Sequence, residues 1–268
     1  MSDPLFNNGS PMMDLIANYS DLKDASVFIT GGGSGIGASL TEGFLMQGAK
    51  VAFVQRSDAS AFADEMAEKH GNRPHYMQCD ITDLDRLKAC IDEGAERHGG
   101  LNVLVNNAAN DKRHNTLEVD EDFFDWAVAI NLKAYFFACK AAVPLLRQAG
   151  GGAIVNFSSI SYMIGAAGMP IYTSSNAGIT SMSHTMAREF GPDNIRVNAL
   201  APGWVMTQKQ RDLWVTPENL AEHLDRQCLQ EELVPEDIVG GTLFLASNAS
   251  RMMTGQCMVI DGGVVVPA

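Results

Sequence analysis

The stretch that decides the fold runs from Ala25 to Gly37 and reads ASVFITGGGSGIG. Its first six residues form the apolar run of a buried strand, and the glycines follow at once, ahead of a helical pattern at 36–47. Glycines let a phosphate approach the backbone, and the N–H groups and dipole of a helix N-terminus attract anions. A strand, a glycine turn and a helix in this order predict a dinucleotide site, here with the spacing GxxxGxG.

Further apolar runs alternate with helical patterns along the rest of the chain. The apolar runs lie at 50–55, 75–79, 101–105, 153–158, 195–200 and 256–260, and the helical patterns at 59–70, 84–98, 121–147, 171–190 and 235–246. Strands that alternate with helices build βαβ units and a parallel sheet. The sequence therefore predicts a single-domain, doubly wound α/β fold of Rossmann type with seven parallel strands, at 21–268, after an N-terminal extension at 1–20.

The composition argues against several classes of partner. The 268 residues include 19 Lys and Arg against 32 Asp and Glu, a net charge of −13, so we do not expect nucleic acid as a partner. Five cysteines without close pairing and six scattered histidines predict reduced thiols and no metal site. We see no run of about 18 apolar residues and no signal-peptide pattern, so we predict a cytoplasmic protein without a membrane span.

Five motifs, in this order along the chain, resemble the short-chain dehydrogenase/reductases. They are TGGGSGIG at 30–37, NNAA at 106–109 (the family usually has NNAG), Asn131, the pair Ser159 and Tyr172, and PGWVMT at 202–207. The resemblance covers about residues 21–268. It implies an oxidoreductase that moves hydride between a nicotinamide cofactor and a hydroxyl or carbonyl group.

The resemblance also implies the catalytic positions, which are Asn131, Ser159, Tyr172 and Asn176. In this family the tyrosine is the base, the serine positions the substrate oxygen, and the asparagine at 131 holds a water on the proton path. A lysine four residues after the tyrosine lies on the same helix face, lowers the pKa of the tyrosine and bonds the ribose hydroxyls of the cofactor. Asn176 stands where that lysine belongs.

Asn176 carries no charge that could stabilise a tyrosinate, which leaves three hypotheses open. The chain could be a variant with a weakened step, an enzyme with an alkaline optimum or a cation supplied from elsewhere, or a regulatory protein that binds NADP(H) without turnover. Ser159, Tyr172 and Asn131 are all present. We therefore favour dehydrogenase chemistry that is weakened but measurable.

The choice between NAD and NADP depends on the end of the second strand. A NAD-selective site usually carries an acidic residue there to bind the ribose 2′-hydroxyl, whereas Gln55 cannot repel a 2′-phosphate and Arg56 could pair with one. Ser34 stands where NADP-preferring relatives often carry a basic residue. We predict NADP, with NAD left open. The predicted cofactor contacts are Gly31, Gly33, Ser34, Gly35, Ile36, Gly37, Gln55, Arg56, Asp80, Ile81, Asn107, Ala108, Tyr172, Asn176, Pro202, Gly203, Val205 and Thr207.

The predicted substrate loops lie near 110–116 and 203–234, after the strands. A sugar pocket needs several polar groups and an aromatic ring for the C–H side of the sugar. The segments 109–114 and 203–217 resemble bacterial aldose 1-dehydrogenases of this family, such as those for D-xylose and L-arabinose, which oxidise the anomeric hydroxyl to a lactone. Another small polar alcohol or ketone is the alternative substrate. The candidate substrate contacts are Asn110, Asp111, His114, Ser161, Met163 and Trp204.

The apolar C-terminal segment DGGVVVPA at 261–268 would be adhesive if it were exposed on a monomer. The family resemblance implies that it lies in a subunit interface of a homotetramer. The long helices expected near 121–147 and 171–190 would form the other interface.

Overall fold

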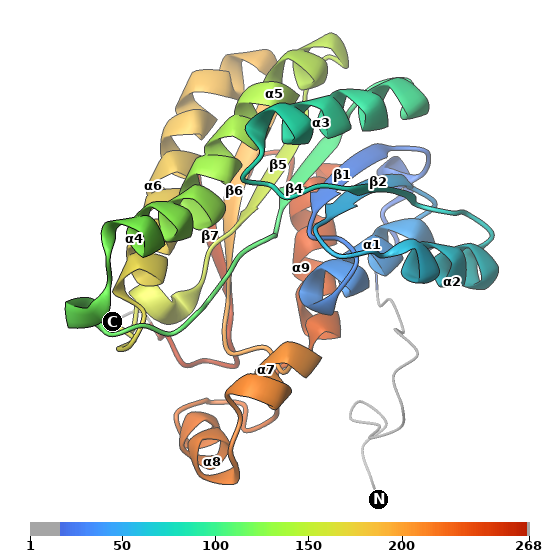
Figure 1. The fold of residues 1–268 in the computed structure, drawn as a ribbon. Coiled ribbons are helices and arrows are strands. Elements are labelled where there is room, and N and C mark those ends of the chain that lie inside the picture. Colours follow the sequence, from blue (N-terminus) through green and yellow to red (C-terminus); the bar gives the residue numbers. More distant parts are fainter. Residues whose placement is uncertain (1–16, 267–268) are drawn as a thin grey trace, which may run out of the picture.

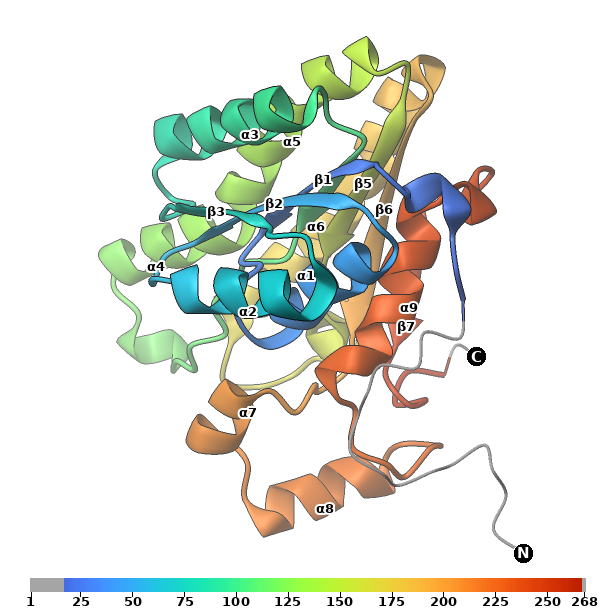
Figure 2. The same cartoon turned by 90° about the vertical axis from the view of Figure 1, so that its right-hand side faces the viewer.

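The computed structural model describes residues 17–266. Residues 1–16, most of the predicted extension, and the last two residues of the C-terminal segment lie outside the described part. The described chain forms three layers, with a sheet between two layers of helices (Figure 1). Turning the molecule by 90° shows helices α1, α2 and α9 on one face of the sheet and α3, α5 and α6 on the other (Figure 2).

The sheet confirms the predicted doubly wound fold with seven parallel strands. Its spatial order is β3-β2-β1-β4-β5-β6-β7, so the order reverses between β1 and β4, where such sheets open a crevice for ligands. Each strand lies within two residues of its predicted range. The bounds are β1 Ser26–Thr30, β2 Lys50–Gln55, β3 His75–Gln78, β4 Val103–Asn106, β5 Gly152–Phe157, β6 Ile195–Pro202 and β7 Cys257–Ile260.

Both faces of the sheet are buried, which explains why its central strands read as continuous apolar runs. In β1, Val27 and Ile29 belong to the core under α1 and α9, whereas Phe28 belongs to the core under α3 and α5. Burial on both sides fixes the strand register, because a shift by one residue would exchange the two sets of side chains.

The predicted helices are present, and residues with capping contacts or a positive φ mark where several of them begin or end. Asp83 caps α3 by accepting the Arg86 N–H, and Gly99 ends that helix with φ +85°. Gly71 ends α2 in the same way with φ +69°. The bounds are α1 Gly35–Met46, α2 Ser60–His70, α3 Leu84–His98, α6 Pro170–Phe190 and α9 Pro235–Ala246.

Two predicted segments differ from the structure. The helix expected at 121–147 consists of α4 Glu121–Val128, a π-helical turn Ala129–Lys133 and α5 Ala134–Gln148. The segment expected as a substrate loop at 203–234 contains two helices, α7 Gln208–Leu213 and α8 Pro217–Asp225. Thr207 and Thr216 cap these helices, and both were available as sequence signals.

The segment Glu121–Gln148 bears on the prediction that the chain has no membrane span. With a mean hydropathy of 1.3 in its most apolar window, it is long and apolar enough to cross a membrane by length and composition. Core helices of soluble proteins can have the same length and apolar composition. In this fold α5 packs against α3 and strands β4 and β5, where Ala138, Cys139 and Leu146 are fully buried.

Candidate active site

A cavity of about 860 Å³ opens at the carboxyl ends of β1, β2, β4, β5 and β6. Most predicted site residues line it, so one cavity joins the glycine turn to the predicted substrate loops. These are Gly31, Ser34, Gly35, Ile36, Gly37, Gln55, Arg56, Asp80, Ile81, Asn107, Ala108, Asn110, Asp111, Ser159, Ser161, Tyr172, Asn176, Pro202, Gly203, Trp204, Val205 and Thr207. Gly33, His114, Asn131 and Met163 do not line it.

The glycine turn leaves an anion site at the N-terminus of α1. Gly31 and Gly35 have φ of +71° and +52°, which favours glycine, and a Cβ on Gly37 would lie 1.9 Å from the Gly31 carbonyl oxygen. No side chain caps α1 at Ser34, and its first turn holds no acidic residue. The first N–H groups of α1 therefore keep their capacity to bind the pyrophosphate of a dinucleotide, so the site fits a nicotinamide cofactor.

Asn107 ties the glycine turn to β4. Its side-chain amide donates to the carbonyls of Thr30 at 3.1 Å and Gly31 at 3.2 Å, and its backbone N–H donates to the Thr30 hydroxyl. These contacts hold the ends of β1 and β4 together at the point where the strand order reverses. Asn107 thus fixes the floor of the cavity.

The end of β2 presents Gln55 and Arg56 to the cavity. Gln55 donates to the Ser34 hydroxyl at 3.0 Å and accepts a long bond from the Gly33 N–H at 3.4 Å, so it braces the glycine turn. Gly33 therefore contributes to the turn from behind, without lining the cavity. Arg56 is exposed at the rim and forms no ion pair with another described residue.

Asp80 and Ile81 follow β3 at the same end of the cavity. The Asp80 carboxylate accepts from the backbone N–H and the hydroxyl of Thr82, at 2.9 and 2.8 Å. Ile81 is buried and belongs to the core under α3. This end combines an apolar wall with a fixed carboxylate.

Ser159 and Tyr172 meet in the cavity from different elements. Ser159 follows β5, and its hydroxyl accepts from the Ser161 N–H at 3.1 Å, while Tyr172 lies in the first turn of α6. Burial raises the pKa of Tyr172 to about 12, and the carboxylate of Asp111 adds to the rise. Asn176, Ser159 and Arg113 oppose this shift of the pKa only in part. A tyrosinate is therefore poorly stabilised here.

The side chain of Asn176 is turned toward its own helix. It is 3% exposed, and its side-chain amide donates to the Tyr172 carbonyl at 2.8 Å. Its backbone carbonyl accepts from the Ser158 hydroxyl at 2.9 Å. Asn176 reaches the cavity wall but brings no positive charge to it.

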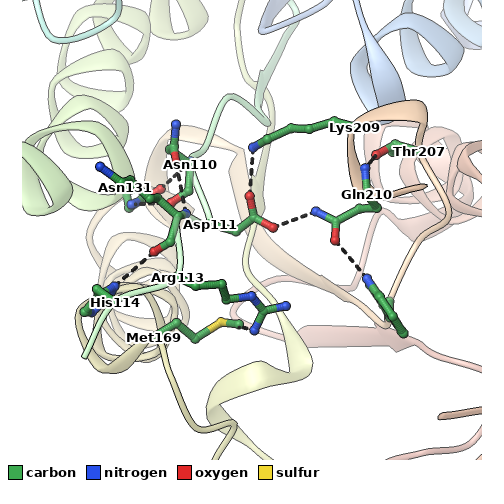
Figure 3. A network of polar contacts seen from close by, with 11 residues as sticks. Asn110, Asp111, Arg113, His114, Asn131, Met169, Thr207, Lys209 and Gln210 are labelled. Carbon is green, nitrogen blue, oxygen red and sulfur yellow. Dashed lines mark hydrogen bonds and ion pairs between the residues drawn. The ribbon is translucent and has the colours of Figure 1, made fainter. Parts of the chain in front are cut away.

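Asn131 lies in the π-helical turn and is 2% exposed. Its amide oxygen accepts from the Asn110 N–H at 2.8 Å, and its nitrogen donates to the carbonyls of Asn110 and Ala127, both at 3.0 Å. The side chain thus occupies both backbone groups of Asn110 and fixes the start of the substrate loop (Figure 3).

Asp111 connects the substrate loop to α7 (Figure 3). Its carboxylate pairs with the Lys209 ammonium at 2.8 Å and accepts from the Gln210 amide at 2.6 Å, and Gln210 in turn accepts from the Trp204 indole at 2.8 Å. Burial alone would raise the pKa of Asp111, but Lys209 and Gln210 lower it below the usual value. The carboxylate is therefore charged at neutral pH.

His114 and Met163, two predicted substrate contacts, lie away from the cavity. The His114 ring accepts from the Ile171 N–H at 3.3 Å through Nε2, and its Nδ1 lies 3.0 Å from the Lys112 carbonyl. The ring also packs on Phe123, with the centroids 5.0 Å apart. His114 thus holds the substrate loop against the start of α6, and Met163 follows the short turn after Ser159.

Several cavity residues were absent from the predicted set, among them the polar and aromatic side chains of Arg113, Lys209, Gln210 and Trp214. The Arg113 guanidinium lies 5.4 Å from the centroid of Trp214 and 3.5 Å from the sulfur of Met169. The polar character of 208–211 was visible in the sequence, but which of its side chains faces the cavity depends on α7.

Within residues 17–266, no three His, Cys, Asp or Glu side chains gather as metal ligands.

Comparison with known proteins identifies the family. A family model described as enoyl-(acyl carrier protein) reductase matches residues 31–265, and the cavity joins the glycine turn to Ser159 and Tyr172. The chain belongs to the short-chain dehydrogenase/reductase family. As a member, it is an oxidoreductase that uses a nicotinamide cofactor.

Several short-chain dehydrogenase/reductases match nearly the whole chain. A protein of Rhizobium meliloti (strain 1021) described as a probable galactose dehydrogenase is 45% identical over 92% of this chain and 98% of its own. The D-xylose 1-dehydrogenase of Caulobacter vibrioides (strain NA1000 / CB15N) is 43% identical with the same coverage. The solved structure of the Thermoplasma acidophilum aldohexose dehydrogenase has a TM-score of 0.84 at 26% identity, covering 94% of this chain and 98% of that one.

Proposed function

We propose that this protein oxidises an aldose at its anomeric carbon to the lactone. The observation that carries the proposal is the polar wall formed by Asp111, Lys209 and Gln210 beside the Trp204 indole, in the same cavity as Tyr172. Such a wall suits the hydroxyls and the C–H face of a sugar better than an acyl chain or a steroid. The names of the relatives at 45% and 43% identity, a galactose and a D-xylose dehydrogenase, support the same substrate class.

In the proposed reaction, Tyr172 and Ser159 act on the anomeric hydroxyl group of the sugar. A bound nicotinamide cofactor would accept the hydride, with both electrons of the anomeric C–H bond. The hydroxyl proton would pass to the oxygen of the ionised form of Tyr172, and the C–O bond would become the lactone carbonyl. Ser159 holds the reacting oxygen by a hydrogen bond.

The high pKa of the buried Tyr172 makes proton removal the weak step in this proposal. Because the phenol of Tyr172 has a pKa of about 12, only a small fraction is ionised near neutral pH. We therefore expect slow turnover at pH 7 that rises steadily into the alkaline range.

For the cofactor we propose NADP. Arg56 lies at the cavity rim without a carboxylate partner in the described chain, and β2 ends in the neutral Gln55, so a 2′-phosphate meets a cation and no anion. Replacing Arg56 by Ala should weaken NADP binding about tenfold and leave NAD binding within twofold. A tenfold preference of the unaltered protein for NAD would contradict the proposal.

The experiment that tests the function is a substrate screen across pH with both cofactors. Pentoses and hexoses are compared with polyols, a steroid and an acyl-carrier substrate, and the product is checked as a lactone. We expect turnover with aldoses, highest at alkaline pH. Activity confined to apolar alcohols would contradict the sugar proposal, and cofactor binding without any turnover would favour the regulatory alternative.

We also propose that the protein is a cytoplasmic homotetramer. Phe124 of α4 and Phe136 of α5 are 49% and 45% exposed, which gives the predicted helix interface an apolar surface. Light scattering coupled to gel filtration tests this, and a monomeric mass at micromolar concentration would contradict it.

A further inference from the structure

The hydroxyl of Tyr135 lacks a hydrogen-bond partner in the described structure. Tyr135 lies at the start of α5, one turn after Asn131, and is 1% exposed. Among the residues on the cavity wall it is one of the most deeply buried, and its hydroxyl is the one phenol oxygen of the described chain that is buried without a partner. A buried hydroxyl without a partner costs free energy, so such a group indicates a missing acceptor or donor.

Tyr135 lines the same cavity as Tyr172. Burial raises the pKa of Tyr135 well above its usual value, and a negative charge on Tyr172 raises it further. Tyr135 is therefore neutral over the whole working range of pH and keeps its proton as a hydrogen-bond donor. Its hydroxyl has no partner in the described structure, whereas the Asn176 amide donates to the backbone of its own helix.

We propose that the Tyr135 hydroxyl binds a hydroxyl of the cofactor ribose beside Tyr172, directly or through a water. It thereby supplies a neutral hydrogen bond in place of the one that the family's lysine makes. Tyr135 is then a cofactor-binding residue that no motif of the sequence indicates. The inference rests on the nicotinamide cofactor and is independent of which sugar is the substrate.

The test measures the binding of cofactor fragments, so its result does not depend on knowing the substrate. ADP-ribose carries the ribose that would reach Tyr135, whereas ADP has both phosphates but lacks this ribose. Calorimetry of the full chain with Tyr135→Phe should show ADP-ribose weakened about 3- to 10-fold, the worth of one neutral hydrogen bond, and ADP unchanged within twofold. Equal affinity for ADP-ribose in the variant and the unaltered protein would overturn the proposal, as would an equal loss for both ligands.

Two controls and one second ligand keep the result interpretable. Tyr19→Phe removes a phenol remote from the cavity and should change neither affinity, while Tyr172→Phe should also weaken ADP-ribose selectively. An ADP-ribose analogue without the hydroxyls of the terminal ribose should bind the unaltered protein and Tyr135→Phe equally. If the variant and the unaltered protein instead bind this analogue with different affinities, the Tyr135 hydroxyl acts through packing and the proposal fails.

Discussion

The side-chain amide of Asn176 donates to the backbone carbonyl of Tyr172 at 2.8 Å, one turn back along α6. This bond directs the Asn176 amide at the helix and brings no positive charge to this position. Burial raises the pKa of the Tyr172 phenol to about 12, which determines the first prediction.

Asn176→Lys should shift the pH–rate profile of oxidation to lower pH. A positive charge one turn from Tyr172 favours the tyrosinate, so the pKa of Tyr172 should fall by at least one unit and the rate at pH 7 should rise by about tenfold or more. The measurement is kcat/KM from pH 6 to 10.5. Asn176→Met, a long side chain without charge, is the control, and an absence of gain near pH 7 in the lysine variant would show that the base is not limiting.

Asp111→Asn should weaken sugar binding and, at the same time, make it easier to ionise Tyr172. The variant loses the ion pair with Lys209, so KM for the sugar should rise by about tenfold. It also removes a negative charge that raises the pKa of Tyr172, so the alkaline midpoint should move to lower pH. Lys209→Gln should raise KM as well but move the midpoint upward, because it leaves the carboxylate charged and unpaired. Identical shifts in the two variants would contradict this assignment.

Gly37→Ala should abolish cofactor binding and destabilise the fold by about 1–3 kcal/mol. The added Cβ would lie 1.9 Å from the Gly31 carbonyl oxygen and 2.7 Å from the Asn107 amide, so α1 must move away from the glycine turn. Gly240→Ala in α9 is the matched control, because nothing lies within 4 Å of its added Cβ. That control should raise the free energy of unfolding slightly. Normal cofactor affinity in Gly37→Ala would refute the tight approach at this turn.

The stability of the protein should fall between pH 6.5 and 4 through His98. Burial, with the nearby His75, Lys50 and Arg97, lowers the pKa of His98 to about 4, and its Nδ1 lies 3.1 Å from the Ser26 hydroxyl. In the unfolded chain the pKa of His98 is near 6.5, so the unfolded chain takes up this proton at a higher pH than the folded chain. As the pH falls, protonation therefore stabilises the unfolded state relative to the folded state. We expect a loss of about 1–2 kcal/mol after solvent screening, measured by urea unfolding. His98→Gln should flatten this part of the curve, and an unchanged slope would exclude His98 as its source.

The sequence predicted the fold closely because local patterns are sufficient for it. Each apolar run became a strand within two residues, since a sheet buried on both faces requires such runs. The helices α7 and α8 were missed because each is short, although Thr207 and Thr216 gave cap signals. The π-helical turn at Asn131 was also missed, because it depends on the bonds of that side chain to the distant Asn110.

By itself the sequence determined the glycine turn that begins α1, the positions of seven parallel strands along the chain and the presence of an asparagine four residues after Tyr172. Only the tertiary structure decided how the side chains are paired: the Asn176 amide with its own helix, Asp111 with Lys209 across 98 residues of chain, and the Tyr135 hydroxyl on the cavity wall with no partner in the described structure. The physical reason is that backbone elements follow from local patterns of apolar residues and glycines. The pairing of polar groups, in contrast, follows from which loops and helices the folded sheet brings to the same edge.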